Sequence, residues 1–164
     1  MSWTVIESPV GDLRLVETNG AISQIEFEPF PPAGQSHDGR PRGDRDDANP
    51  LLVEAARQLR AYFDRDLKEF DLPLAPVGTD FQQQVWKELC EIGYGETSSY
   101  GDLAHRLGKS NAASRAVGLA NGRNPIPIVI PCHRVIGADG TLTGYAGGIA
   151  RKQTLLEIEQ DALF

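Results

Sequence analysis

The stretch Asn124-Pro-Ile-Pro-Ile-Val-Ile-Pro-Cys-His-Arg-Val135 is the segment around which the rest of the chain is organised. Its β-branched residues favour an extended, buried backbone, whereas its three prolines lack the N–H that a central strand needs. We therefore expect a rigid, extended segment that carries the thiol of Cys132 to a fixed place. Because His133 follows at once, the pair suggests nucleophilic chemistry with an imidazole base.

Cys132 also has a purely structural interpretation, because a lone cysteine is more often a small buried apolar residue than a nucleophile. In an extended chain, neighbouring side chains point to opposite faces, so His133 would act on the sulfur through a water or a bent backbone. Metal binding is not predicted, because no Cys-x-x-Cys pair or matching histidine pair occurs among Cys90, Cys132, His37, His105 and His133.

The composition is that of an ordinary soluble globular protein, with 164 residues, of which 40% are hydrophobic and 24% charged. No apolar run is long enough to span a membrane, and the amino terminus has no basic segment followed by an apolar core. Two cysteines fit a reducing compartment better than a disulfide scaffold. We therefore expect a cytoplasmic protein without a membrane partner.

The net charge of −7 is unevenly distributed along the chain. Residues 1–78 hold 8 Lys and Arg against 14 Asp and Glu, whereas residues 79–164 hold 8 against 9. No acidic residue occurs between positions 102 and 139, an interval that contains five basic ones: Arg106, Lys109, Arg115, Arg123 and Arg134. Such a locally cationic surface can bind phosphates despite the overall negative charge.

The first half of the chain predicts a small sheet followed by one helix. Residues 3–6, 13–16 and 21–27 alternate as strands between turn-forming segments, which favours an antiparallel meander. Residues 29–49, rich in Pro, Gly and Asp, predict a flexible loop. Asn49 and Pro50 are typical of a helix start, and that helix would end near Arg65. An extended connector over residues 67–78 then separates a domain at 1–75 from one at 76–164.

The second half is predicted to be mostly helical. A helix beginning near Thr79 has a buried stripe that includes Trp86 and Cys90. Two short helices, at 100–107 and 112–120, form a helix–turn–helix within the interval that lacks acidic residues, which indicates DNA binding. Arg115 would reach a groove or the base stack, and three other basic residues would contact phosphates: Arg106, Lys109 and Arg123.

The end of the chain adds a loop and a last helix to this domain. The Gly-rich loop at residues 144–148 contains one aromatic residue, Tyr145, suited to fold over a planar ligand. An amphipathic helix over residues 149–160 closes the chain, with Glu157 or Glu159 as the candidate to face inward.

Several linked motifs resemble those of the O6-alkylguanine-DNA alkyltransferases, also called methylated-DNA–protein-cysteine methyltransferases. Over about residues 79–160 these motifs are Thr-Asp-Phe-Gln-Gln-Gln-Val-Trp, Ser-Tyr-Gly-Asp-Leu-Ala, Arg-Ala-Val-Gly-x-Ala, Asn-Pro-x-Pro with Pro-Cys-His-Arg-Val, Gly-Tyr-x-Gly-Gly and Lys-x-x-Leu-Leu-x-x-Glu. The resemblance implies an α+β protein in which a small ribonuclease-H-like sheet and helix domain precedes a mostly helical domain with a helix–turn–helix.

The same resemblance implies direct-reversal DNA repair. An alkyl group would pass irreversibly, once per molecule, from O6-alkylguanine to the protein's own cysteine after base flipping, with no cofactor and no metal. O4-alkylthymine is a second candidate substrate. The partner would be double-stranded DNA containing alkylated guanine, bound through its minor groove by a monomer that acts alone or cooperatively along the DNA.

The resemblance also implies a catalytic set of four residues. Cys132 would accept the alkyl group, and His133 would deprotonate it through a water molecule. Glu159 would orient His133 and balance its charge, while Asn124 matches the family's hinge asparagine.

The resemblance further implies contacts to the base and to the DNA. Tyr100 would donate to N3 of the base, Tyr145 would meet O6, and Val135 and Ala146 would lie beside the base. Arg115 would fill the space of the displaced nucleotide, and the residues expected to lie against the minor groove are Ala116, Ala120 and Asn121.

Two departures from the family pattern and two competing functions complete the prediction. Some members bind zinc in the amino-terminal part, where this chain has only His37, so no zinc is expected; Ala146 stands where some relatives have serine. A cysteine hydrolase would use the same Cys132, His133 and Glu159 but needs an oxyanion hole. A lesion binder that performs no transfer would lack the reactive cysteine.

Overall fold

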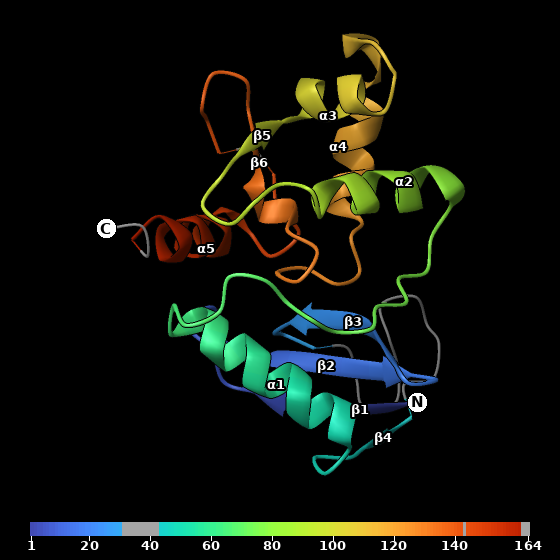
Figure 1. The fold of residues 1–164 in the computed structure, drawn as a ribbon, viewed down its shortest axis with the longest axis vertical. Helices are drawn as coiled ribbons and strands as arrows, with labels where there is room; N and C mark the ends of the chain where they lie inside the picture. Colours follow the sequence, from blue (N-terminus) through green and yellow to red (C-terminus); the bar gives the residue numbers. More distant parts are fainter. Residues whose placement is uncertain (31–42, 143, 162–164) are drawn as a thin grey trace. The chain divides into compact units, whose positions relative to one another are not determined.

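The computed structural model describes residues 1–30, 43–142 and 144–161, and the chain divides into two compact units, Met1–Pro76 and Val77–Phe164. In the described residues, the first unit is a sheet with one helix, and the second is mostly helical (Figure 1). The α+β class expected from the sequence is therefore confirmed. Among the described residues, no helix combines the length and the apolar composition needed to cross a membrane.

The sheet of the first unit has the strand order β3-β2-β1-β4. β1 (Ser2–Ile6), β2 (Leu13–Thr18) and β3 (Ala21–Phe27) form the predicted antiparallel meander. A short strand, β4 (Asp44–Arg45), pairs parallel with β1 inside the segment that the sequence predicted as a flexible loop. Side chains anchor it, since Trp3 Nε1 donates to the Gly43 carbonyl oxygen at 3.2 Å. Residues 31–42 of the predicted loop lie outside the described residues.

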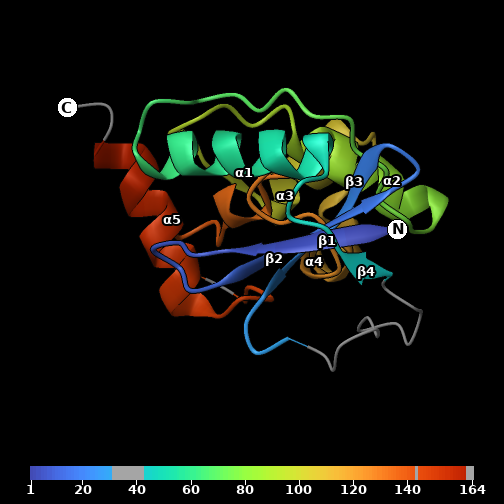
Figure 2. The same ribbon diagram turned by 90° about the horizontal axis from the view of Figure 1, so that it is seen from below.

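The helix of the first unit, α1 (Pro50–Phe63), begins where capping chemistry predicted it. The Asn49 side chain accepts hydrogen bonds from the backbone N–H groups of Leu51 and Leu52, and Pro50 occupies the first turn. α1 packs on the sheet, mainly against β2 (Figure 2). The buried Gln58 of α1 exchanges two hydrogen bonds with the backbone of Asp71, at 2.8 and 2.9 Å. This pair fastens the connector to α1.

Three helices of the second unit pack together: α2 (Asp80–Leu89), α3 (Tyr100–Arg106) and α4 (Ser114–Gly122). Thr79 and Gln82 form a capping box at the start of α2, and Ser99 caps α3. A 3₁₀ turn, η1 (Asn111–Ala113), delays the start of α4 by two residues relative to the predicted 112–120 helix. The remaining elements are β5 (Ser98–Ser99), which pairs parallel with β6 (Val135–Ile136), η2 (Cys132–Arg134) and the closing helix α5 (Ile149–Asp161).

Cys90 is not in the core, contrary to the sequence prediction. The buried stripe of α2 consists of Val85, Trp86 and Leu89, and the helix ends at Leu89. Cys90 therefore lies just past the last helical residue and is exposed. Helical spacing predicts which side chains are buried only as far as the helix continues. The prediction for Cys90 failed because the helix ends one residue before it.

The central stretch 124–135 is folded into turns and is not extended, so that prediction was also wrong. The backbone N–H of Ile130 donates to the Ile126 carbonyl at 2.9 Å, and Ile128 has a φ of 75°. A β-branched residue in this left-handed region costs about 1–3 kcal/mol. Asn124 holds the turn closed, because its Nδ2 donates to the Ile130 carbonyl at 2.8 Å and its Oδ1 accepts from the Ile126 N–H at 3.0 Å. Cys132 then begins the 3₁₀ turn η2.

The buried Trp86 couples α2 to α4, because its Nε1 donates to the Ala120 carbonyl at 2.9 Å. We predict that Trp86→Phe lowers the free energy of unfolding by about 2 kcal/mol, from the lost hydrogen bond and the unfilled space. Urea unfolding followed by circular dichroism measures the loss. Trp3→Phe is the matched control, since its indole bond to Gly43 is exposed. Equal losses for both variants would refute the coupling.

Candidate active site and DNA-binding pocket

The Cys132 thiol is buried at the start of η2, with 3% of the residue exposed. Its backbone N–H donates to the Ile130 carbonyl at 2.8 Å, so the turn closed by Asn124 also fixes the thiol. Burial raises the pKa of Cys132 to about 11, although the polar groups of Asn124 and Tyr145 and the charge of Lys152 act in the opposite direction. The thiol is therefore protonated at neutral pH and needs a base to become a nucleophile.

His133, the residue after Cys132, is held by Glu159, a buried carboxylate on α5. His133 Nε2 lies 2.6 Å from Glu159 Oε2, and Arg134 donates from Nε to Oε1 at 2.8 Å and from Nη2 to Oε2 at 3.1 Å. The backbone N–H of Gly95 adds a bond to Oε1 at 3.2 Å. Burial alone would raise the pKa of Glu159, but the hydrogen bonds and charges of His133 and Arg134 bring it down to about 2. Glu159 is thus ionised throughout the physiological range.

The fully buried ring of His133 is neutral at neutral pH. Burial lowers its pKa below the ordinary 6.5, and the charges of Arg134 and Lys152 add to this effect, while Glu159 opposes it. Because the ionised Glu159 can only accept, Nε2 of the neutral ring carries the hydrogen. Nδ1 has no hydrogen-bond partner among the described residues. The ring therefore offers one free lone pair, at Nδ1, to accept a proton.

Arg134 is a buried member of this site and does not belong to the cationic surface that the sequence predicted. Only 6% of the residue is exposed. Besides its two bonds to Glu159, it donates from Nη1 to the Ile92 carbonyl at 2.6 Å, and its guanidinium lies 5.8 Å from the ring centroid of Tyr94. The guanidinium of Arg134 is buried and paired with Glu159, so it is not available to phosphates.

Lys152 is a second buried cation that the sequence prediction missed. Its Nζ donates to the Val135 carbonyl at 2.5 Å, and burial lowers its pKa, which the nearby Cys132 opposes. Val135 was expected to lie beside the DNA base. In the structure its side chain is fully buried, and its backbone carbonyl accepts the hydrogen bond from Lys152. The sequence did contain a signal for Lys152. It lies two helical turns before Glu159 on α5, and this spacing places both side chains on one face of the helix.

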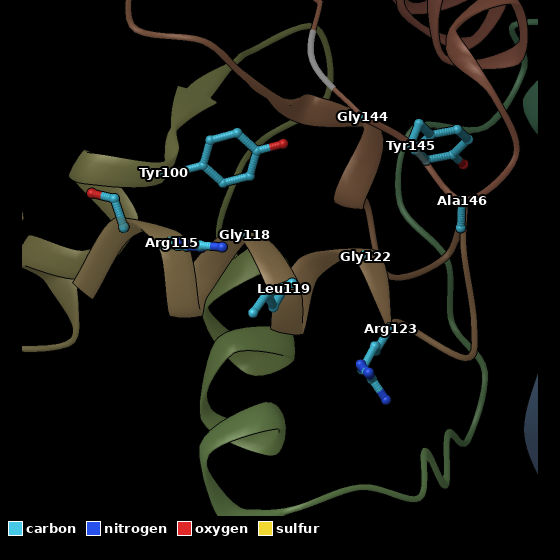
Figure 3. A pocket seen from close by; sticks show the side chains of 10 residues that line it. Tyr100, Arg115, Gly118, Leu119, Gly122, Arg123, Gly144, Tyr145 and Ala146 are labelled. Atoms are coloured by element: carbon cyan, nitrogen blue, oxygen red, sulfur yellow. The ribbon is translucent and has the colours of Figure 1, made fainter. Parts of the chain in front are cut away.

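An open pocket of about 560 Å³ lies beside the thiol site. It is formed by α4, the first residue of α3 and the loop at 144–146 (Figure 3). The pocket brings together five of the predicted residues, namely Tyr100, Arg115, Arg123, Tyr145 and Ala146. Tyr145 links the two sites, since it lines the pocket and also lowers the pKa of the Cys132 thiol.

Other predicted DNA-binding residues lie away from this pocket. Arg106 Nη1 is 4.0 Å from Glu88 Oε1, and Lys109 Nζ lies 5.7 Å from the ring centroid of Phe81, so both extend towards α2. Ala116 is exposed on α4. Two residues predicted to touch DNA are instead buried: Ala120 accepts the Trp86 indole, and Asn121 Nδ2 lies 3.5 Å from the Cys132 carbonyl. Their inward position follows from the packing of α4 on α2, which the sequence does not reveal.

His105 and Cys90 do not join the site, and His37 lies outside the described residues. His105 Nε2 lies 2.8 Å from Asn111 Oδ1, a contact that ties α3 to η1. Cys90 is exposed at the end of α2. Over the ranges that the structure describes, no three His, Cys, Asp or Glu residues gather as a metal site would require.

Two family models match the chain, one for each unit. Residues 1–76 match the ribonuclease-like domain of 6-O-methylguanine DNA methyltransferase. Residues 80–161 match the DNA-binding domain of the same enzyme. The matched ranges follow the division of the structure into two units.

Full-length relatives and solved structures agree with these matches. A methylated-DNA–protein-cysteine methyltransferase of Methanosarcina mazei is 58% identical over 163 residues, which cover 99% of each chain. The enzyme of the same name from Mycobacterium tuberculosis is 49% identical, covering 96% of this chain and 92% of the relative. The crystal structure of Mycobacterium tuberculosis OGT in complex with DNA aligns with a TM-score of 0.88 at 46% identity, covering 99% of this chain and 94% of that one. The chain thus belongs to the methylated-DNA–protein-cysteine methyltransferases, enzymes of DNA repair that carry a DNA-binding domain.

Proposed function

We propose that this protein transfers the alkyl group of an O6-alkylguanine in duplex DNA to Sγ of Cys132, once per molecule. The observation that carries the proposal is the neutral His133, whose Nδ1 is left to accept a proton while Glu159 holds Nε2. It supplies the base that a thiol with a raised pKa needs. A bridging water carries the proton from Sγ to Nδ1, and the ionised Glu159 stabilises the imidazolium that forms.

The transfer is a direct displacement at carbon. The Sγ electron pair attacks the alkyl carbon, the carbon–O6 bond breaks, and its electron pair stays on guanine O6. Tyr145, which lines the pocket and acts on the pKa of the thiol, would donate to O6 as that charge develops. The product is a thioether that has no route back to thiol within this site. Single use of each molecule follows from that chemistry.

Access to O6 requires that the guanine leave the base stack, because its alkyl group lies inside the duplex. The pocket beside the thiol is the proposed receptor for the flipped base, with Tyr100 donating to N3 and Ala146 beside the alkyl-bearing edge. Arg115, exposed on α4, fills the gap in the duplex from the minor groove. O4-alkylthymine, which presents an alkylated oxygen in the same way, is the proposed second substrate.

Cys132→Ala is the first test of this function. We predict that the variant loses transfer completely and keeps its affinity for a duplex containing one O6-methylguanine within about twofold, because the thiol is buried and contributes no binding surface. Transfer is measured with a radiolabelled methyl group and affinity by fluorescence anisotropy. Cys90→Ala, the other free cysteine, is the control and should transfer at the unaltered rate.

Two results would contradict the proposal. Residual transfer by Cys132→Ala would place the acceptor elsewhere. Loss of transfer and of binding together, with a lowered unfolding midpoint, would make Cys132 a structural residue.

The pH dependence of the transfer rate tests the electrostatic part of the mechanism. His133 must be neutral to accept a proton, so the rate should rise with pH through a midpoint below 6.5 and then level off. Arg134 lowers the pKa of His133, and its removal should raise that pKa. We therefore predict that Arg134→Gln moves the acid limb of the rate profile to higher pH, while Arg134→Lys, which keeps a charge, moves it less.

The control for this experiment is Arg57→Gln, which removes the same charge from an exposed position on α1. It should leave the midpoint where it is in the unaltered protein. Single-turnover rates between about pH 5 and pH 8 cover the titration of the imidazole. A uniformly slower Arg134→Gln variant with an unchanged midpoint would show that Arg134 has only a structural role.

A further inference from the structure

Leu119 on α4 is a large apolar side chain that the folded chain leaves in water. The residue is 62% exposed. Five large apolar residues are exposed in the described part of the chain, and Leu119 is the one among them that also lines the pocket beside the thiol. Isolated apolar residues on a surface are common, so exposure alone assigns no role. Whether Leu119 has a role in binding therefore depends on the residues around it.

Two arginines line the same pocket as Leu119. Arg115 lies four residues before Leu119 and shares a ridge of α4 with it, and Arg123 lies four residues after it, just past Gly122, where the helix ends. Both arginines are exposed and line the same pocket as Leu119. This wall of the pocket therefore presents an apolar group between two cations, a pattern complementary to apolar deoxyribose and base surfaces between two phosphates.

Two glycines of α4, which carry no side chains, lie next to Leu119 in the lining of the pocket. Gly118 and Gly122 adjoin it, one residue before and one turn after, and neither carries a side chain. A Cβ added to Gly118 would come 3.7 Å from the ring of Tyr100, and one added to Gly122 would meet nothing within 4 Å. The Leu119 side chain therefore projects between two low points of the helix surface. Figure 3 shows it on the helix side of the pocket, across from the loop that carries Tyr145.

We propose that Leu119 is an apolar wedge that packs into the minor groove at the site of the displaced nucleotide, next to Arg115. The inference rests on the proposed function, since it needs a flipped-out base. Proteins that enter the minor groove often insert leucine or a similar side chain between base steps, which offsets part of the lost stacking. Arg115 supplies charge and stacking in the space that the displaced nucleotide leaves in the duplex. Leu119 excludes water from the apolar sugar and base surfaces that border this space.

Leu119→Ala tests the wedge, and the exposure of the side chain means that folding does not depend on it. The measurement is the second-order rate constant of methyl transfer from one O6-methylguanine, in a duplex and in a single strand of the same sequence. We expect about a tenfold loss on the duplex, as for the burial of a truncated leucine, and less than a twofold loss on the single strand. Leu119→Met should restore most of the duplex rate, and Leu119→Gln should not.

Val53→Ala is the matched control, because Val53 is an aliphatic residue on α1 that is 51% exposed. It should leave both rates unchanged. An unaffected duplex rate in Leu119→Ala would refute the wedge and leave the proposed function intact. Equal losses on duplex and single strand would also refute it, because they would make Leu119 part of the base pocket. If the unaltered protein transferred from neither substrate, the proposed function itself would fail.

Discussion

The buried Glu159 carboxylate accepts hydrogen bonds from His133, Arg134 and the backbone of Gly95. A carboxylate taken out of water is costly unless it is fully paired, and removal of one partner from such a group typically costs about 3–5 kcal/mol. These bonds join α5, the turn that bears the thiol and the segment after α2. The same ionised group fixes the tautomer of His133. One interaction thus determines both the local fold and the direction in which the imidazole can accept a proton.

A second constraint acts from the other side of the thiol. Asn124 closes the turn that places Ile128 at a positive φ, and Cys132 hydrogen-bonds the end of that turn. Strain of this kind persists where the surrounding structure holds it, and it is common at functional sites. Between the Asn124 turn and the Glu159 cluster, the sulfur has a defined position next to Tyr145. Its pKa of about 11 keeps the thiol protonated at neutral pH until a base removes the proton.

The features that the sequence predicted well are those decided by neighbouring residues. The helix starts at Asn49, Thr79 and Ser99 depend on side chains within three positions, and the meander depends on alternation and turns. The motifs that resemble the family also led to His133 and Glu159, which the structure joins by a hydrogen bond, and to Cys132, the residue before His133. The errors concern contacts distant in sequence. Nothing near Arg134 reveals that its charge is used by a carboxylate 25 residues later, and the inward position of Ala120 follows from a tryptophan 34 residues earlier.

Intact-protein mass spectrometry after mixing equal amounts of the protein and a duplex with one O6-methylguanine tests the alkyl-transfer mechanism most directly. The geometry around Cys132 predicts a gain of one methyl group per molecule, mapped to the peptide that contains Cys132, with no further gain when more DNA is added. An unchanged protein mass with the duplex still bound would contradict it, because the chain would then recognise the lesion without the chemistry that His133 and Glu159 are arranged to perform.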